Sequence, residues 1–429
     1  MKNLTIPKVY VETYGCTMNR SDSDLLRGII SSKFTVTNKI NESDVVVINS
    51  CGVVEFTERK IIKRILELKK AGKKVVVAGC LPRISPRKMR EIADGMLSPD
   101  NILEINDVIN STLKGEKAIK ISLRNLDKAS LYGIKRRLKD STIAIVSISE
   151  GCLGKCSFCV TRFARGRLHS FNFDRILEEV KNVVEQGFKE IQLTSQDTGA
   201  YGLDKNGKKL PDLLEEIVKI EGNFRVRVGM MNPHHALIIL DDLINAYFSE
   251  KIYKFIHVPV QSGDNKVLES MRRNHTVEDF IEVVSRFRES FKDVMVATDI
   301  IVGYPTENEE AFWKTYELIR EIKPDLVNIT RFSPRPKTEA CKFRDIVSRI
   351  KKERSRKLTR LVNEIKEEIN KKFVGRKFKV LITKHGKKNT LLSRTDSYRP
   401  VILNEGKIGD FLNTKIISSS RTCLLGKIV

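Results

Sequence analysis

The sequence predicts an α/β protein built of a parallel α/β domain, a longer series of β/α units and a small β-rich domain. Short β-branched runs alternate with helical patterns in residues 1–113, and the same alternation repeats six times within residues 142–370. The tail, residues 371–429, instead carries short β-runs separated by turn residues. With roughly 100–200 residues per domain, the 429 residues divide into these three domains and a linker at 114–141.

The first domain has three strand-like runs, "KVYVETYG" (8–15), "DVVVINS" (44–50) and "KKVVVAG" (73–79). Helical patterns at 21–32 and 55–72 separate them, and the second pattern ends at a glycine, which is typical of a helix C-terminus. The runs are apolar on both faces, as in parallel sheets that helices cover on both sides. Residues of this domain are therefore expected to form a covered parallel sheet.

The middle domain has six strand candidates, separated by helical patterns such as 173–187 and 307–322. The candidates are 142–149, 190–195, 225–230, 254–260, 294–301 and 325–332. Six β/α units in tandem predict a partial (β/α)6 barrel of the TIM type, in which chemistry occurs at the C-terminal ends of the strands. Five of the six strands run into conspicuous polar loops there: "EGCLGKC", "QDTGAYG", "MNPHH", "QSGDN" and "SPRP".

The segments around and after the barrel are strongly charged. The linker is basic and has little periodicity, and residues 346–372 predict a long helix whose mixed charges most simply form a solvated face. The tail predicts a small antiparallel β-barrel in which Lys and Arg recur. Such a module suits nucleic-acid binding, and a solvated β surface is the alternative.

Composition narrows the class of protein. There are 78 Lys and Arg against 54 Asp and Glu, a formal net charge of +24, which favours a polyanionic partner such as nucleic acid over a merely Lys-rich surface. No run reaches the roughly 18 apolar residues that cross a membrane, and the N-terminus lacks an apolar signal core. We expect an intracellular, cytoplasmic protein without a membrane partner. Eight cysteines in such a chain indicate ligation or catalysis rather than disulfides.

Two groups of cysteines stand out. Cys152, Cys156 and Cys159 have the spacing C-x3-C-x2-C and follow the first strand of the predicted barrel. No second C-x2-C pair completes a zinc site, so thiolates at this density favour an iron–sulfur cluster with one iron left open. The other group is Cys16, Cys51 and Cys80, which each follow a strand of the first domain. Parallel strands end at one edge of their sheet, so these thiols favour a second cluster over three small apolar residues.

The run "GCLGKCSFC" resembles the signature of the radical S-adenosylmethionine (SAM) enzymes. The resemblance implies that Cys152, Cys156 and Cys159 hold a [4Fe–4S] cluster whose fourth iron binds SAM. SAM is then cleaved reductively to a 5′-deoxyadenosyl radical, which removes hydrogen from an unactivated C–H bond. An electron-donor protein of the ferredoxin or flavodoxin type is implied as a partner.

The runs "ETYGCTMNRSDSD", "INSCGVVEFTERK" and "VAGCLPR" are similar to the N-terminal motifs of the methylthiotransferases within that family. This implies a second [4Fe–4S] cluster on Cys16, Cys51 and Cys80 that presents sulfur, which makes all six cysteines catalytic and metal-ligating. The likeness extends to the tail, which resembles a TRAM domain, an RNA-binding module. "LTSQDTGAYG" and "GCLGKCSFCVTRFARGRL" look most like the archaeal and eukaryotic branch. That branch converts N6-threonylcarbamoyladenosine next to the tRNA anticodon to its 2-methylthio derivative.

The resemblance also implies SAM-contacting residues on the other strand-end loops: Gln196, Asp197, Gln261, Asp299, Gly303 and Arg331. From the residues alone, Asp197 fits a helix N-cap equally well, and Arg331 fits an ion pair with an acidic neighbour. Three arginines after the cluster cysteines, Arg162, Arg165 and Arg167, are expected to contact an RNA backbone or simply to be exposed.

Several alternatives remain open from the sequence. The substrate of a methylthiotransferase is also compatible with another tRNA adenosine or an aspartate of a ribosomal protein. Another sulfur-inserting radical SAM enzyme, or a non-catalytic RNA-binding protein with structural metal, would share part of the pattern. The sequence does not determine the oligomeric state, for which a monomer is the expectation.

Overall fold

The structure is a computed structural model that describes residues 6–123, 125–133 and 141–429. The chain divides into two compact units. The first contains residues 1–137, 150–171 and 333–342, and the second contains 138–149, 172–332 and 343–429. Residues 124 and 134–140 of the predicted linker lie outside the described residues. Within the described ranges, no helix combines the length and the apolar character needed to cross a membrane.

The first unit contains a six-stranded parallel sheet with the order β2-β1-β3-β4-β5-β6. Its strands are β1 (Lys8–Thr13), β2 (Thr35–Val36), β3 (Val45–Ser50), β4 (Lys74–Gly79), β5 (Gly95–Leu97) and β6 (Ala118–Lys120). The three strands predicted for this domain are present, with bounds that differ by one or two residues. β6 comes from the segment predicted as a linker and pairs with β5 at the edge of the sheet.

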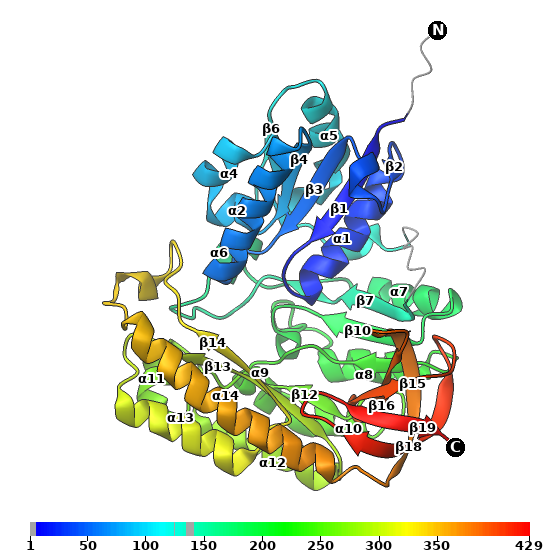
Figure 1. Ribbon diagram of the computed structural model, residues 1–429, viewed down its shortest axis with the longest axis vertical. Coiled ribbons are helices and arrows are strands. Elements are labelled where there is room, and N and C mark those ends of the chain that lie inside the picture. Colours follow the sequence, from blue (N-terminus) through cyan, green and yellow to red (C-terminus); the bar gives the residue numbers. More distant parts are fainter. Residues whose placement is uncertain (1–5, 124, 134–140) are drawn as a thin grey trace. The chain divides into compact units, whose positions relative to one another are not determined.

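Helices cover both faces of this sheet, as the apolar strands predict (Figure 1). They are α1 (Thr17–Ile30), α2 (Glu55–Lys70), α3 (Leu81–Ile84), α4 (Pro86–Ile92) and α5 (Ile105–Leu113), with 3₁₀ turns at Ile40–Glu42, Pro99–Glu104 and Lys128–Leu131. Leu25 and Leu26 of α1 pack with α5 against one face, and Ile61 and Ile65 of α2 pack with α4 against the other. The same unit holds the loop between β8 (Ser149–Glu150) and β9 (His169–Ser170), with α6 (Thr161–Arg165), and the turn at Glu339–Lys342.

The second unit contains the six strands predicted for the barrel. They form two three-stranded parallel sheets, β7-β10-β11 and β12-β13-β14, which an isolated parallel bridge between Met230 and His257 joins. The strands are β7 (Ile143–Ser147), β10 (Glu190–Thr194), β11 (Arg225–Arg227), β12 (Phe255–His257), β13 (Met295–Val302) and β14 (Leu326–Arg331). The strands follow one another in chain order, so the predicted partial barrel is confirmed.

Helices separate the barrel strands along the chain. They are α7 (Phe173–Glu185), a 3₁₀ turn at Thr198–Ala200, α8 (Leu210–Lys219), α9 (Pro233–Ile238), α10 (Leu240–Tyr247), α11 (Asn265–Ser270), α12 (Val277–Ser290) and α13 (Glu309–Ile322). The predicted long helix is α14 (Ser348–Lys371), which contacts β14 and α13. Its buried residues, among them Leu358, Leu361 and Ile365, recur at helical spacing, so one side packs and the charged side remains in solvent.

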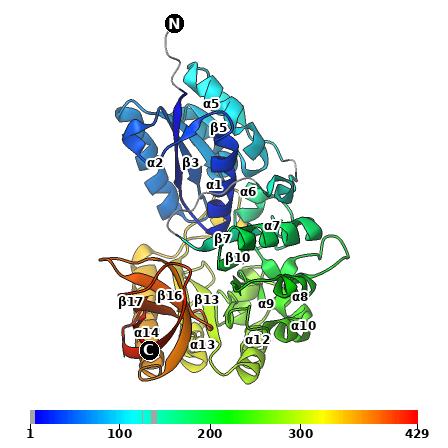
Figure 2. The ribbon, with the colours of Figure 1, turned by 90° about the vertical axis from the view of Figure 1, so that its right-hand side faces the viewer.

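The tail forms a closed five-stranded barrel with the order β15-β16-β17-β19-β18 (Figure 2). Its strands are β15 (Lys377–His385), β16 (Leu391–Thr395), β17 (Pro400–Leu403), β18 (Phe411–Ser419) and β19 (Leu424–Ile428). The predicted small antiparallel barrel is confirmed, with one difference: β17 and β19 pair in parallel, while the other four pairs are antiparallel.

A turn of this small barrel closes the N-terminal end of the partial barrel. Tyr398, between β16 and β17, packs on Tyr253 and Phe255 near the start of β12. Its hydroxyl donates to Glu190 at 3.2 Å and accepts from Gln192 at 3.1 Å, and both partners belong to β10. The opposite ends of the strands therefore remain for the predicted chemistry.

Candidate functional site

Cys16, Cys51 and Cys80 follow β1, β3 and β4, which are neighbours in the sheet. α1 leaves β1 on one face of the sheet, and α2 leaves β3 on the other face. The helices that follow the neighbouring strands β1 and β3 therefore lie on opposite faces of the sheet. Such a switch point opens a crevice at the carboxyl ends of parallel strands. Two of the three cysteines flank this crevice, and Cys80 lies one strand further along.

Close backbone contacts bring the three cysteine loops together. The backbone N–H of Cys80 donates to Ser50 O at 2.9 Å, which places it beside Cys51. A Cβ atom built on Gly15, next to Cys16, would lie 3.1 Å from the sulfur of Cys51. Gly79 has a φ of +89°, a conformation that favours glycine, and it packs against the backbone of Ser50. The loops thus converge because glycines precede two of the cysteines.

The chemistry of this thiol group suits an iron–sulfur cluster. Burial raises the pKa of Cys51, and it raises the pKa of Cys80 to about 12, to which the neighbouring thiols add. Such thiols are held neutral until a metal displaces their protons. Among the described residues, no three His, Cys, Asp or Glu side chains surround a common point closely enough for one ion. A cubane spreads three thiolates over three irons, so the group fits a cluster.

The loop that carries Cys152, Cys156 and Cys159 belongs to the same unit. A Cβ atom on Gly154 would lie 3.3 Å from the sulfur of Cys152 and 3.6 Å from that of Cys156, so this glycine leaves space beside both sulfurs. Backbone N–H groups point at the sulfurs: Gly154 donates to Cys152 at 3.3 Å and Thr161 to Cys159 at 3.4 Å. N–H donors aimed at half-buried thiols, and a glycine that keeps a side chain away from two of the sulfurs, fit a bound cluster.

The two cysteine loops touch through apolar side chains. Val160 and Ala164, which follow Cys159, pack in one buried cluster with Cys80 and Ile84. The α6 residue Ala164 also accepts a hydrogen bond at 3.1 Å from Arg83, which follows Cys80. The two cysteine loops, which come from distant parts of the chain, are therefore packed against each other in the first unit.

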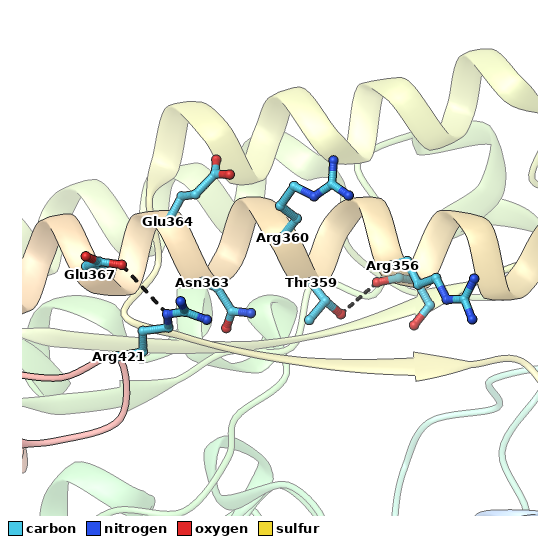
Figure 3. A pocket seen from close by; sticks show the side chains of 8 residues that line it. Arg356, Thr359, Arg360, Asn363, Glu364, Glu367 and Arg421 are labelled. Carbon is cyan, nitrogen blue, oxygen red and sulfur yellow. Dashed lines mark hydrogen bonds and ion pairs between the residues drawn. The ribbon is translucent and has the colours of Figure 1, made fainter.

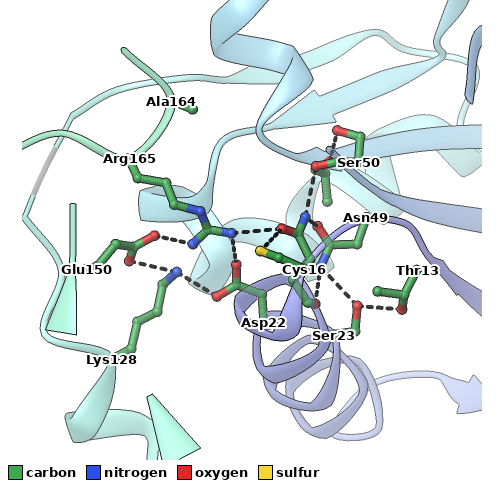
Figure 4. Close-up of polar contacts among 12 residues, drawn as sticks. Thr13, Cys16, Asp22, Ser23, Asn49, Ser50, Lys128, Glu150, Ala164 and Arg165 are labelled. Carbon is green, nitrogen blue, oxygen red and sulfur yellow. Dashed lines mark hydrogen bonds and ion pairs between the residues drawn. The ribbon is translucent and has the colours of Figure 1, made fainter. Parts of the chain in front are cut away.

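Four buried charges, Asp22, Lys128, Glu150 and Arg165, form a closed ring beside the cysteines, which we call the ionic ring (Figure 4). Arg165 donates to Asp22 at 2.7 Å and to Glu150 at 2.5 Å. Lys128 lies 2.7 Å from Asp22 and 2.8 Å from Glu150. Burial alone would raise the pKa of Asp22, but the charges of Arg165 and Lys128 lower it overall. Positive and negative charges alternate, so the ring is neutral.

A chain of hydrogen bonds connects the ionic ring to the group of Cys16, Cys51 and Cys80. Arg165 donates to the side-chain oxygen of Asn19 at 3.4 Å, and the thiol of Cys16 donates to the same oxygen at 3.3 Å. Asn19 in turn donates to Ser50 O at 2.9 Å, beside Cys51. The expectation that Arg165 contacts RNA or is exposed is wrong, because these partners bury it, whereas Arg167 is exposed and Arg162 is half-buried.

Three of the predicted SAM-contacting residues lie after β10 and β12 in the second unit. Gln196 is half-buried. Asp197 is buried and fully engaged, because one oxygen accepts from Asn232 N at 3.0 Å and the other lies 2.7 Å from His235 Nδ1. Gln261 has a φ of +75° and pairs with β13 through two backbone hydrogen bonds. A role in SAM binding stays a prediction for all three.

Asp299, Gly303 and Arg331 lie on or after β13 and β14. Asp299 accepts from His257 at 2.9 Å and from Asn328 at 2.7 Å. Burial opposes ionisation of Asp299, but these hydrogen bonds lower its pKa overall. The space beside Gly303 holds the side chain of Lys351 from α14, so packing already requires this glycine. Arg331 is exposed and has no ion pair within the described chain.

Comparison with known proteins identifies the family. Three family models match: the Radical SAM superfamily over residues 146–319, Uncharacterized protein family UPF0004 over 8–97 and the TRAM domain over 371–429. An Archaeoglobus fulgidus protein named "Probable threonylcarbamoyladenosine tRNA methylthiotransferase" is 58% identical, covering 98% of both chains. The threonylcarbamoyladenosine tRNA methylthiotransferase of Drosophila melanogaster is 35% identical over 98% of this chain and 78% of its own. The chain belongs to the threonylcarbamoyladenosine tRNA methylthiotransferase family.

In this methylthiotransferase family member, the six cysteines of the two groups fall within two of the matched models. Cys16, Cys51 and Cys80 lie in residues 8–97, and the C-x3-C-x2-C group lies in residues 146–319. A radical SAM methyltransferase from Kitasatospora setae, solved with cobalamin and a [4Fe–4S] cluster bound, shares the fold. Its TM-score is 0.56 at 14% identity, over 78% of this chain and 77% of that one.

Sequence reasoning missed the ionic ring, Asn19 and Arg83. The members of the ionic ring come from α1, from the predicted linker and from both ends of the loop that carries Cys152, Cys156 and Cys159. No local spacing in the sequence therefore marks them. One signal was present: Asn19, Ser21, Asp22 and Ser23 occupy positions where a helix beside a sheet normally carries apolar residues, and all four are buried.

Proposed function

We propose that this protein is a radical SAM methylthiotransferase that acts on tRNA. It converts N6-threonylcarbamoyladenosine next to the anticodon to 2-methylthio-N6-threonylcarbamoyladenosine. The observation that carries the proposal is the presence of two three-cysteine groups in one compact unit, in a chain that matches named relatives over nearly its full length. The net charge of +24 and the TRAM domain match at 371–429 support tRNA as the substrate.

In this proposal each cysteine group holds one [4Fe–4S] cluster. Cys152, Cys156 and Cys159 hold the cluster that binds SAM, and the strand-end group of Cys16, Cys51 and Cys80 holds the other. When bound, the clusters and SAM supply reductive SAM cleavage and the sulfur that becomes the methylthio group. Three thiolates per cluster leave one coordination position open in each group, which suits these two tasks.

The chain's own residues position these groups. The N–H donors of Gly154 and Thr161 stabilise thiolate charge at the first group. Asn19 and Arg165 orient the loops of the second group. The residues proposed to contact SAM are Gln196, Asp197, Gln261, Asp299, Gly303 and Arg331. Asp197 also fixes the start of α9 through its hydrogen bond from Asn232.

We further propose the domain boundaries 1–113, 142–370 and 371–429, with 114–141 between the first two. The protein acts in the cytoplasm as a monomer, and a ferredoxin- or flavodoxin-like protein supplies electrons. A low-potential one-electron donor is needed because SAM cleavage in this family is reductive.

The test is mass spectrometry of tRNA nucleosides from cells that lack the protein. We expect the 2-methylthio derivative to disappear and N6-threonylcarbamoyladenosine to accumulate, and the wild-type gene to reverse both changes. An unchanged 2-methylthio-N6-threonylcarbamoyladenosine level would refute the substrate assignment. Loss of methylthio from another adenosine, or from a ribosomal protein aspartate, would assign the alternative substrate.

A further inference from the structure

α14 and the small barrel together form a polar groove of about 430 Å³ (Figure 3). Seven of its lining residues belong to α14, and Arg421 reaches toward the helix from the loop between β18 and β19. The lining is Ser355, Arg356, Thr359, Arg360, Asn363, Glu364, Glu367 and Arg421. Each of the described side chains that line this groove carries a polar or charged group, which suits a polar ligand.

The N-terminal part of the groove carries unpaired positive charge. Arg356 and Arg360 are exposed, are one helical turn apart, and form no ion pair with the part of the chain that the structure describes. Arg349 and Lys352 extend the same row toward the start of α14, are equally exposed and form no ion pair within 4 Å among the described residues, although Glu353 lies close enough to Arg349 to interact with its charge. Spacings of three and four residues place these four cations along one side of the helix.

In the C-terminal part of the groove, negative charges offset the positive charges. Arg421 lies 3.7 Å from Glu367, which also pairs with Lys371 at 3.0 Å. Glu364 is exposed and adds a further negative charge. Between the two parts, the Asn363 amide forms no hydrogen bond within the described residues and offers both a donor and an acceptor. The excess positive charge of the groove therefore lies toward the N-terminal end of α14.

We propose that this groove and the basic row of Arg349, Lys352, Arg356 and Arg360 bind the sugar–phosphate backbone of the tRNA substrate. The proposal deepens the function above and depends on it, because it names where the same tRNA is held. Guanidinium groups form paired hydrogen bonds with phosphate oxygens, and unpaired exposed arginines need no existing partner to be displaced. Asn363 is placed to hydrogen-bond a ribose hydroxyl, and the carboxylates mark where the backbone leaves the helix.

The experiment measures binding of the holoenzyme to a tRNA that carries N6-threonylcarbamoyladenosine next to its anticodon, over a range of salt concentrations. The variant is Arg356→Ala/Arg360→Ala. The matched control is Arg175→Ala/Arg320→Ala, which removes two exposed arginines from α7 and α13, outside the groove. Iron content and thermal stability of both double variants report whether the fold is retained.

We expect the groove variant to weaken tRNA binding by about tenfold at physiological salt. The slope of log K against log salt falls by roughly 1.4–1.8 in magnitude, because each of the two lost phosphate contacts removes roughly 0.7–0.9 from it. The control changes affinity by less than about twofold, since charges further than about 8 Å from the RNA are screened. An equal affinity and salt slope for wild type and groove variant would overturn the proposal.

Glu364→Gln provides a test of opposite sign. Removing this negative charge from the groove should tighten tRNA binding, which a loss of structure cannot do. Weaker or unchanged binding by this variant would contradict a phosphate path along α14. If the wild-type holoenzyme does not bind the tRNA, the proposed function itself fails. If it binds and modifies the tRNA while all groove variants match it, only the groove assignment fails.

Discussion

The guanidinium of Arg165 lies 2.7 Å from the carboxylate of Asp22, although 143 residues separate them in the chain. Arg165 ends the helix that follows Cys159, and Asp22 belongs to the helix that begins after Cys16. This ion pair therefore joins the two cysteine loops directly, and Lys128 and Glu150 complete the ionic ring around it. The side chains of the ionic ring therefore hold the two cysteine loops at a fixed spacing without the help of a bound cluster.

Replacing Arg165 by Met should destabilise the protein strongly. Removal of one member leaves the carboxylates of Asp22 and Glu150 buried with a single cation, and such losses cost about 3–5 kcal/mol. Denaturant unfolding of the anaerobic protein measures this cost. The exposed neighbour Arg167 provides the control, because Arg167→Met should change the unfolding free energy by less than about 0.5 kcal/mol.

A double variant tests whether the pair acts as a unit. Asp22→Asn/Arg165→Met removes one charge of each sign, so it should cost less than the sum of the two single replacements by about 1–3 kcal/mol. Additive costs would show that the two side chains stabilise the protein independently, contrary to the closed ring in Figure 4.

Replacing Cys51 by Ala should separate the two cysteine groups by their chemistry. Iron content is expected to fall from about eight to about four per chain, since one three-thiolate group remains. SAM cleavage should persist while methylthio transfer stops. Cys156→Ala should instead abolish SAM cleavage, and Cys423→Ala, at a cysteine outside both groups, should change neither. Product formation by the Cys51→Ala enzyme would refute the assignment of two clusters.

Gly79 should tolerate no side chain, because its position brings Cys80 next to Cys51. Gly79→Ala places a Cβ atom about 2.6 Å from Ser50 O in a backbone with φ of +89°. Gly72 has a similar φ of +73° but open space around it, so Gly72→Ala carries only the conformational cost of about 1–2 kcal/mol. We expect Gly79→Ala to be the more destabilising and to lose about half of the bound iron. Equal stability and full iron in both variants would contradict the close packing of the cysteine loops.

Much of this fold was predictable because apolar patterns and strand positions determine it. A local run of β-branched residues marks each of the strands β1, β3 and β4 and each of the six barrel strands. These strands can therefore be recognised from the sequence alone. The start of α1 was not predictable, and the helix was expected only from residue 21, whereas it begins at Thr17. Its first turns bury Asn19, Ser21 and Asp22, and polar side chains there hide the helical pattern. Asn19 is polar because it holds the loops of Cys16 and Cys51, and Asp22 because it belongs to the ionic ring.

The six cysteines were predictable for a related reason. Each follows a strand or lies in a closely spaced group, so topology alone gathers them. The ionic ring was not predictable, because Lys128 comes from a segment without periodicity and its partners Asp22 and Glu150 lie on separate elements. The Asp197 carboxylate illustrates the same limit: sequence suggested a cap or a cofactor contact, and its contact with His235 required the structure.

Tyr398 should be essential for attachment of the small barrel. Its ring is buried against Tyr253 and Phe255, and its hydroxyl satisfies Glu190 and Gln192. Tyr398→Phe keeps the ring but leaves those polar groups short of a partner, at a cost of about 1–3 kcal/mol. Tyr398→Ala also opens a cavity and should cost about 3–5 kcal/mol. Thermal unfolding measures both, and a larger cost for Phe than for Ala would show that burial of the ring contributes little.

Asp299 should make stability depend on acid pH. Its pKa in the folded protein lies below the ordinary value, because the hydrogen bonds from His257 and Asn328 outweigh the effect of burial. The ionised carboxylate therefore stabilises the fold above the unfolded-state pKa of about 3.9, and this contribution is lost as the pH falls through the lower folded-state pKa. Asp299→Asn cannot ionise, so its stability deficit relative to wild type should be largest above about pH 5 and should shrink below about pH 4. Denaturant unfolding of both apoproteins across this range checks the prediction, and a deficit that grows on acidification would mean that the His257 and Asn328 contacts do not favour the ionised form.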